Sequence, residues 1–178
     1  DSFRANRADM LRLIDEFRAL ENKIRETGET KRELFAKRGQ IMPRERLALL
    51  LDPGAPFLEL SSLAGYKLHD DKDGSMAGGG IIAGIGYIAG VRSLVIANNS
   101  AIKGGTISPT GLKKSLRLQQ IAFENKLPVV TLAESGGANL NYAADIFVEG
   151  ARGFANQARM SAMGLPQITV VHGSSTAG

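Results

Sequence analysis

Two stretches of small residues, each directly after an apolar run, are the parts of this 178-residue sequence best suited to chemistry. One extends from Ser135 to Ala138 after the apolar run 129–133, and the other from Gly173 to Gly178 after the run 168–172. Small residues let a ligand approach the backbone, where amide N–H groups can stabilise an oxygen that gains negative charge. The sequence therefore predicts an oxyanion site, although each turn alone is equally compatible with an ordinary tight connection.

Five charged residues near these turns could act on a substrate. Glu134 directly precedes the first turn and could serve as a base, but an acid at a strand end more often caps a helix or pairs with a cation. Lys103, Lys113, Lys114 and Arg117 surround a predicted helix and could bind the phosphates of an adenine-nucleotide tail. Exposed helix lysines usually have no specific ligand, so both interpretations stay open.

Three other kinds of site are disfavoured. The stretch 173–177 is one residue away from a GxSxG nucleophile elbow, but the only histidines are His69 and His172, and His172 lies inside the predicted strand, only three residues from Ser175. Two histidines and no cysteine are too few for a metal site of their own. The stretch 78–83 matches GxGxxA but lacks the strand-then-helix context of a dinucleotide site.

The elements that would position the two turns alternate between strand and helix. Ser108 and Pro109 predict the start of a helix that ends near Asn125. The other expected elements are a hairpin of strands 81–88 and 91–97, a buried strand over 128–133, a helix over 140–163 that is broken or bent near Gly150 and Gly153, and a buried strand over 167–172. This βαβαβ order predicts a parallel sheet, whose ligands gather at the carboxyl ends of the strands.

The first fifty residues are charged and helical instead. Apolar residues between 10 and 24 fall on one stripe of a helix, and shorter helices are expected over 31–37 and 44–51. We therefore divide the chain into a helical segment, 1–52, and a glycine-rich α/β domain, 53–178. The helical segment is interpreted as a lid or an oligomer contact, with a partner-binding module as the alternative.

The composition limits which kinds of partner the protein could bind and in which cellular compartment it could work. The net charge is +4, and basic and acidic residues alternate along the amino-terminal helices, which is typical of a solvated surface and disfavours nucleic-acid binding. Without cysteine there are no disulfides, so we expect a reducing compartment. No apolar run reaches the roughly 20 residues that span a bilayer. We expect the cytoplasm or a mitochondrial matrix, with no membrane partner.

Several ordered motifs resemble the carboxyltransferase (beta) subunit of biotin-dependent acyl-CoA carboxylases. The resemblance begins at about residue 6 and is strongest for the branch that acts on methylcrotonoyl-CoA and geranyl-CoA rather than propionyl-CoA. The motifs are Pro43-Arg44-Glu45-Arg46-Leu47, Leu50-Leu51-Asp52-Pro53-Gly54, Phe57-Leu58-Glu59-Leu60, Gly79-Gly80-Ile81-Ile82, Ala97-Asn98-Asn99, Lys103-Gly104-Gly105, Lys113-Lys114, Ser135-Gly136-Gly137-Ala138 and Ser174-Ser175-Thr176-Ala177-Gly178.

The resemblance implies a fold and a reaction. The expected fold is α/β, a crotonase-like (ClpP/crotonase) superhelix of ββα units with an amino-terminal helical segment. The reaction would move a carboxyl group from carboxybiotin to an acyl-CoA through a thioester enolate, with biotin itself removing the proton, so that no side-chain base is needed. By resemblance, the backbones of Gly136, Gly137, Ala138 and Gly178 would stabilise the enolate oxygen. Lys103, Gly104, Gly105, Lys113, Ser135 and Ala177 would bind the acyl-CoA.

The resemblance also implies partners. Biotin would be carried on a separate subunit or domain, and a partner biotin carboxylase would use ATP and bicarbonate. We expect a homo-oligomer with its active site at a subunit interface. The alternatives are a biotin-dependent acyl-CoA decarboxylase, a non-catalytic assembly subunit that binds partners through helices 6–51, and, less favoured, a hydratase, which would need a second acid beside Glu134.

Two features depart from the family's pattern. Methylcrotonoyl enzymes continue the first turn with an aromatic residue and Leu-Pro, whereas this chain has Asn139-Leu140-Asn141, so a longer acyl chain such as geranyl is admissible. Family chains also continue beyond the position of Gly178 into a second domain that holds the partner's biotin. Residues 1–178 alone are therefore expected to bind a thioester poorly and to be inactive.

Overall fold

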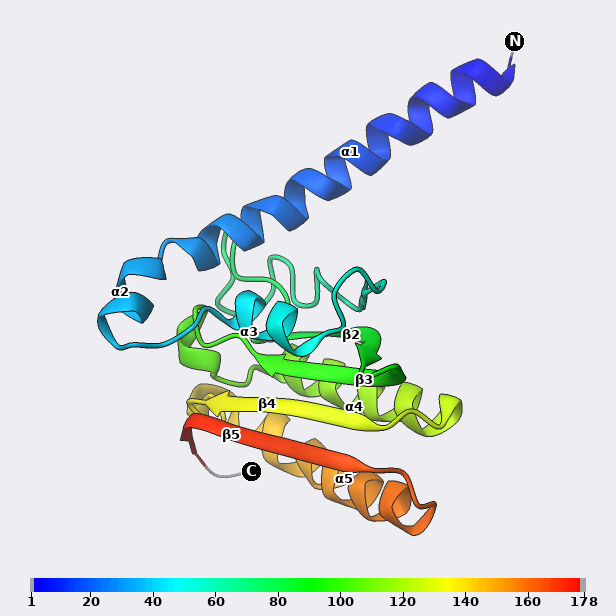
Figure 1. Ribbon diagram of the computed structural model, residues 1–178. Coiled ribbons are helices and arrows are strands. Elements are labelled where there is room, and N and C mark those ends of the chain that lie inside the picture. The colour runs from blue at the N-terminus through cyan, green and yellow to red at the C-terminus, as the bar shows by residue number, and fades with distance from the viewer. Residues whose placement is uncertain (1, 177–178) are drawn as a thin grey trace.

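A five-stranded mixed sheet organises the chain (Figure 1). The computed structural model describes residues 2–176. Neighbouring strands follow sequence order; β1, β2 and β3 pair antiparallel, whereas β3, β4 and β5 pair parallel. The strands are β1 (Leu58–Glu59), β2 (Ile81–Ile88), β3 (Val91–Asn98), β4 (Val129–Ser135) and β5 (Gln167–Ser175). The helices are α1 (Ser2–Glu29), α2 (Arg32–Lys37), α3 (Pro43–Leu50), α4 (Pro109–Asn125) and α5 (Ala143–Ala162), with short 3-10 turns η1 (Lys103–Gly105) and η2 (Leu140–Tyr142).

The predicted hairpin is confirmed as β2 and β3. Their pairing extends from Ile81 opposite Asn98 to Ile88 opposite Val91. The two residues of the turn, Ala89-Gly90, both have positive φ, at 49° and 77°. Two-residue turns with this backbone match the twist of the strands that they join. With α4 the hairpin makes one ββα unit.

The βαβαβ prediction is confirmed by β3, α4, β4, α5 and β5. The hydroxyl of Ser108 accepts a 3.0 Å hydrogen bond from the N–H of Gly111, and Pro109 occupies the first helical position of α4. This N-cap satisfies a donor that would otherwise have no partner in the first turn of the helix. At the other end, Lys126 takes a left-handed conformation that stops the helix.

Apolar cores form on both faces of the sheet. Successive strand residues point to opposite faces, so Ala83 and Leu94 pack toward α4 and α5, while Ile82 and Val95 pack toward Leu47 of α3. Figure 1 shows α4 and α5 side by side behind the sheet, with α3 in front of β2 and β3. The sheet is therefore the middle of three layers.

The predicted amino-terminal helix is confirmed as α1, which extends away from the body for most of its length (Figure 1). Its last turns anchor it, because Ile24 is buried in a cluster with Ala77 and Ile102. Further out, the same apolar stripe is open to solvent: Met10 is 57% exposed and Phe17 is 48% exposed. No helix among residues 2–176 is long and apolar enough to cross a bilayer.

Two expectations about the carboxyl-terminal elements are wrong. The helix expected to be broken or bent near Gly150 and Gly153 has no break there: α5 is continuous, and Gln119 of α4 donates a 3.2 Å hydrogen bond to the carbonyl of Gly153. The strand expected to be buried is β5, but most of its residues are exposed. An apolar run predicts a strand, whereas its burial depends on whether another strand or helix covers it.

The division of the chain at residue 52 stays a prediction, and Asp52 itself ties the helical segment to the sheet. Its backbone N–H donates to the carbonyl of Tyr87 at 2.9 Å. Its carboxylate accepts 2.7 Å hydrogen bonds from the N–H groups of both turn residues, Ala89 and Gly90. The two parts are thus joined by polar contacts as well as by the packing of α3.

Lys114 of α4 is buried, with 4% of its surface exposed, and holds the glycine-rich loop before β2. Its ammonium group donates to the carbonyls of Gly78 and Ile81 at 3.0 and 2.8 Å. Burial lowers the pKa of Lys114 to about 8, while the Glu59 carboxylate raises it and the Arg44 charge lowers it. Lys114 therefore has a structural contact, unlike its exposed neighbour Lys113.

We expect Lys114→Met to change how stability depends on pH. Between pH 8 and 10.5 the folded state loses the Lys114 proton before the unfolded state does, so the wild-type free energy of unfolding rises with pH across this window. The rise relative to Lys114→Met should total on the order of 3 kcal/mol, since each pKa unit corresponds to about 1.4 kcal/mol. Urea denaturation at a series of pH values measures it, with Lys113→Met as the control that keeps the rise. Parallel curves for wild type and Lys114→Met would contradict the assignment.

Candidate functional site

The turn after β4 has two of its backbone donors engaged within the protein. The N–H of Gly136 donates to the carbonyl of Gly104 at 3.0 Å, and that of Gly137 donates to the Ser135 hydroxyl at 3.0 Å. Ala138 pairs with Ile107 in an isolated parallel bridge. Within residues 2–176, no acceptor faces the Ala138 N–H. Of Gly136, Gly137 and Ala138, only Ala138 has an N–H group without a hydrogen-bond acceptor among residues 2–176.

Gly104 and Gly105 lie beneath this turn, as part of η1. Gly105 has φ of 71°, and a Cβ there would lie 2.7 Å from the carbonyl oxygen of Glu134. Its own carbonyl accepts a 3.2 Å hydrogen bond from the Ser135 hydroxyl. In the structure, the backbone of the Lys103-Gly104-Gly105 motif therefore contacts the backbone of the predicted turn after β4.

The end of β5 approaches the same turn from the other side. The N–H of Thr176 donates to the carbonyl of Ser135 at 3.1 Å, and Thr176 lies 3.3 Å from where a Cβ on Gly137 would be. The two small-residue stretches are therefore neighbours in space. Ala177 and Gly178, which were predicted to complete the site, lie outside the described residues.

The two predicted phosphate-binding lysines lie in different places. Lys103 forms a 2.8 Å ion pair with Asp70, whose carboxylate also accepts hydrogen bonds from Tyr142 at 3.0 Å and Asn139 at 3.2 Å. The Lys103 contact, followed by the Tyr142 hydroxyl, lowers the pKa of Asp70. Lys103 borders a small cavity of about 50 Å³ beside the first turn, whereas Lys113 lies outside it.

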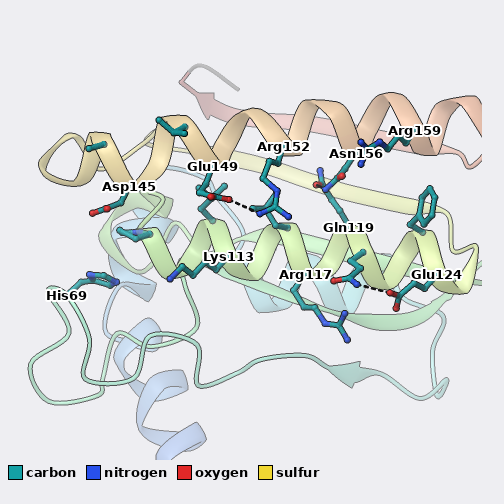
Figure 2. Close-up of a pocket in the computed structure, with 17 residues that line it drawn as sticks. His69, Lys113, Arg117, Gln119, Glu124, Asp145, Glu149, Arg152, Asn156 and Arg159 are labelled. Carbon is teal, nitrogen blue, oxygen red and sulfur yellow. Dashed lines mark hydrogen bonds and ion pairs between the residues drawn. The ribbon is translucent and has the colours of Figure 1, made fainter.

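Lys113 lines a wide groove of about 1210 Å³ between α4 and α5 (Figure 2). Figure 2 shows Lys113 and Arg117 on α4 and Asp145 and Arg152 on α5, with the Arg117 side chain directed away from α5 and His69 near one end. Both basic and acidic side chains line the groove. The groove alone therefore does not select an anionic ligand.

Glu134 binds a cation instead of presenting a free base. One carboxylate oxygen accepts hydrogen bonds from Arg46 at 2.6 Å and from Ser100 at 2.7 Å, and the other accepts from Gln40 at 2.9 Å. Only 9% of Glu134 is exposed. We call these four residues the Glu134 cluster.

The negative charge of Glu134 is stabilised by the other members of the cluster. Burial raises the pKa of Glu134. Hydrogen bonds from Ser100 and Arg46 and the charge of Arg46 lower it by a larger amount, so the pKa lies below its usual value. His172 lies beside the pair, with Nε2 3.4 Å from Arg46. Burial and the Arg46 charge lower the pKa of His172, whereas Glu134 raises it. An ionised, fully hydrogen-bonded carboxylate is a poor general base.

Three members of the Glu134 cluster were not assigned to the site from the sequence. Arg46 belongs to one of the family-like motifs but carries no local signal of its role, and Gln40 and Ser100 carry none. In the chain, Glu134 lies 88 residues from Arg46, 94 from Gln40 and 34 from Ser100. Within residues 2–176, no group of three or more His, Cys, Asp or Glu side chains could hold a metal ion.

Comparisons with known proteins agree with the motifs. The family model for the carboxyl transferase domain matches residues 35–178. The chain is 45% identical to the probable mitochondrial methylcrotonoyl-CoA carboxylase beta chain of Drosophila melanogaster, over 99% of this chain and 31% of that protein. It is 77% identical to the beta subunit of P. aeruginosa geranyl-CoA carboxylase, whose crystal structure matches with a TM-score of 0.92 over 99% of this chain and 33% of that one.

A more distant structure shows the fold alone. Transcarboxylase 12S, solved as a hexamer with hydrolysed methylmalonyl-coenzyme A bound, is 23% identical, with a TM-score of 0.69 over 90% of this chain and 31% of that one. Together with the geranyl-CoA carboxylase subunit it confirms the predicted α/β, crotonase-like fold. The chain spans about a third of the length of these relatives.

Because the backbone of η1 lies close to the Glu134 carbonyl, we expect substitutions of the adjacent residues Gly104 and Gly105 to differ in their effect on stability. Gly104→Ala should lower the free energy of unfolding by about 1 kcal/mol, because its φ of 62° is left-handed but nothing lies within 4 Å of the added Cβ. Gly105→Ala should cost about 3 kcal/mol, because a similar φ is combined with a clash against the Glu134 carbonyl. Urea denaturation of both variants measures the difference. Equal losses would show that the main chains can move apart without cost.

Proposed function

We propose, because this chain belongs to the carboxyl transferase domain family, that it forms the thioester-binding part of a biotin-dependent acyl-CoA carboxylase. The observation that carries the proposal is the approach of the two strand ends. Ser135 of β4 and Thr176, the residue after β5, are joined by a hydrogen bond, so backbone from two parallel strands converges on one point. Loops at the carboxyl ends of parallel strands are where α/β proteins bind ligands.

The proposed chemistry uses the backbone of these turns. The N–H of Ala138, with that of Gly178, would donate to the thioester oxygen as it gains charge when the α- or vinylogous proton leaves. Gly136 and Gly137 would shape the turn, since their N–H groups already have acceptors within the protein. Pre-positioned donors of this kind typically contribute about 2.7–4 kcal/mol each. Glu134 would take no part in proton transfer.

The proposed ligand-binding residues have separate tasks. Ser135, Gly104 and Gly105 would support the turn, and Ala177 would continue the second strand end. Lys103 would reach a phosphate of the acyl-CoA by exchanging its contact with Asp70. Lys113 would do so only for a ligand that extends into the groove between α4 and α5.

The proposed cofactor and partners follow from the relatives. Biotin, on a separate subunit or domain, would deliver the carboxyl group and accept the proton, and a partner biotin carboxylase would use ATP and bicarbonate. A homo-oligomer with its site at a subunit interface is proposed because the distant relative transcarboxylase 12S is a hexamer. We propose the bacterial cytoplasm or the mitochondrial matrix as its compartment, the latter because the Drosophila relative is mitochondrial.

The proposed substrate is a branched enoyl-CoA, such as geranyl-CoA or methylcrotonoyl-CoA. The full-length protein, combined with its biotin-carrying partner, should hydrolyse ATP in a bicarbonate-dependent manner when given these substrates. Its kcat/KM should exceed that for propionyl-CoA by about 10-fold or more, because several misplaced methylene groups cost at least about 1–3 kcal/mol. Release of CO2 from a carboxylated acyl-CoA without ATP use would point to the decarboxylase alternative.

Substitution Gly137→Val separates catalysis from assembly. Gly137 has φ of 85°, which a β-branched residue does not tolerate, and the added side chain would collide with Thr176. In the full-length protein we expect carboxylation to fall by about 10²-fold or more, while size-exclusion chromatography shows unchanged association with the partner subunit. Normal turnover of this variant would favour the assembly-subunit alternative.

A further inference from the structure

We propose that Arg46 and Glu134 are positioning residues, through which the amino-terminal helical segment fixes the spacing between the two backbone turns of the thioester site. This inference rests on the proposed function. Neither side chain needs to touch the substrate. Their effect would be exerted through an irregularity in the pairing of β4 with β5.

The irregularity is a bulge opposite Glu134. Ala133 of β4 pairs with Val171 of β5, and the next pair is Ser135 with Ser175. One residue of β4 therefore opposes three residues of β5, numbers 172–174. Bulges bend a strand and redirect the residues that follow, and they are frequent beside functional sites. Here the residues redirected are Ser175 and Thr176, which meet the first turn.

The Glu134 side chain fills this bulge. A Cβ on Gly173 would lie 2.8 Å from Cγ of Glu134 and 2.9 Å from its Oε1. Any side chain at position 173 would therefore push the carboxylate out. The bulge and the carboxylate fit each other because position 173 is glycine, and His172 beside it lies 3.4 Å from Arg46.

Arg46 holds the carboxylate in this place from α3. The side chains of Arg46 and Glu134 are only 12% and 11% exposed, so their 2.6 Å contact is shielded from solvent. The guanidinium lies over the ring of Phe35, at 5.9 Å, which fixes its own position from α2. A buried carboxylate that lost this partner would be left with an uncompensated charge, which costs several kcal/mol. It would therefore leave the bulge.

The consequence for the site would be a change in the distance between its two halves. The Ser135 carbonyl and the Thr176 N–H join the strand ends immediately after Glu134 and the bulge. If the bulge collapsed, the end of β5 would shift along β4, and Thr176 would move relative to the first turn. A misplacement of about 1 Å can reduce turnover about 10²-fold. Binding of the CoA phosphates, proposed for Lys103 beside Asp70 and for Lys113 in the groove between α4 and α5, would change little.

The same helix supplies a matched control. Arg44, two residues before Arg46, forms a bidentate ion pair with Glu59 of β1 at 3.0 and 2.9 Å. Glu59 is also largely shielded, with its side chain 16% exposed. This pair joins α3 to the opposite edge of the sheet, away from both turns. Like the Arg46–Glu134 pair, the Arg44–Glu59 pair stabilises the contact between the amino-terminal helical segment and the sheet, but it does not contact the bulge.

The experiment compares Glu134→Gln and Arg46→Gln with Arg44→Gln in the full-length protein combined with its biotin-carrying partner. Three quantities are measured: kcat, KM for geranyl-CoA, and affinity for a CoA analogue whose nitronate mimics the enolate. We expect kcat and nitronate affinity to fall about 10²-fold for the first two variants, with KM and geranyl-CoA affinity within about 3-fold of wild type. Arg44→Gln should lower the thermal midpoint comparably but leave kcat unchanged.

The outcomes separate this inference from the proposed function. Wild-type protein that carboxylates no acyl-CoA would overturn the proposed function. If wild type is active, then unchanged kcat in Glu134→Gln and Arg46→Gln, or equal loss of nitronate and geranyl-CoA affinity, would overturn the positioning role. Should the charge-removing variants fail to fold, Ser100→Ala removes one donor and keeps the ion pair; the inference then requires a smaller loss, confined to kcat and nitronate affinity.

Discussion

The charge of a buried carboxylate must be compensated. The groups that compensate the charge of Glu134 fix the arrangement of several parts of this molecule. Water is largely excluded from the end of β4, so the side chains of Arg46, Ser100 and Gln40 replace it. Each comes from a different part of the chain. The loop after α2, helix α3, the loop after β3 and strand β4 therefore meet at one carboxylate.

Close contact between main chains is the second requirement, and it explains where glycine occurs. Gly111 at the start of α4 and Gly79 in the loop before β2 approach so closely that a Cβ on Gly111 would clash with the Gly79 carbonyl oxygen. Lys114 then reaches the same loop with its ammonium group. The amino-terminal end of α4 and the glycine-rich loop are thus held together by a backbone contact and one buried cation.

Local signals in the sequence were sufficient for the elements and the location of the turns. The cap at Ser108 and the hairpin turn at 89–90 depend on neighbouring residues, so they could be predicted. For Glu134 the sequence left open a base, a helix cap or a partner of a cation, because Arg46 is 88 residues away and no local signal identifies it. Likewise, lysines 103 and 113 were recognised by type, but whether each contacts an acid, a loop or open solvent depends on the folded arrangement. Which backbone donors remain free is a property of the tertiary structure, so the engaged N–H of Gly136 had no signal in the sequence.

The open side of β5 affects how the chain behaves at high concentration. Ile168, Val170 and Val171 are 55%, 47% and 62% exposed along a nine-residue strand, and α5 beside it exposes Phe147 and Phe154. A long apolar strand whose outer edge is unpaired is a template for pairing with another copy. Residues 2–176 alone in solution would therefore self-associate through β5, so a soluble preparation would need a charged substitution on that strand or a polypeptide that covers it.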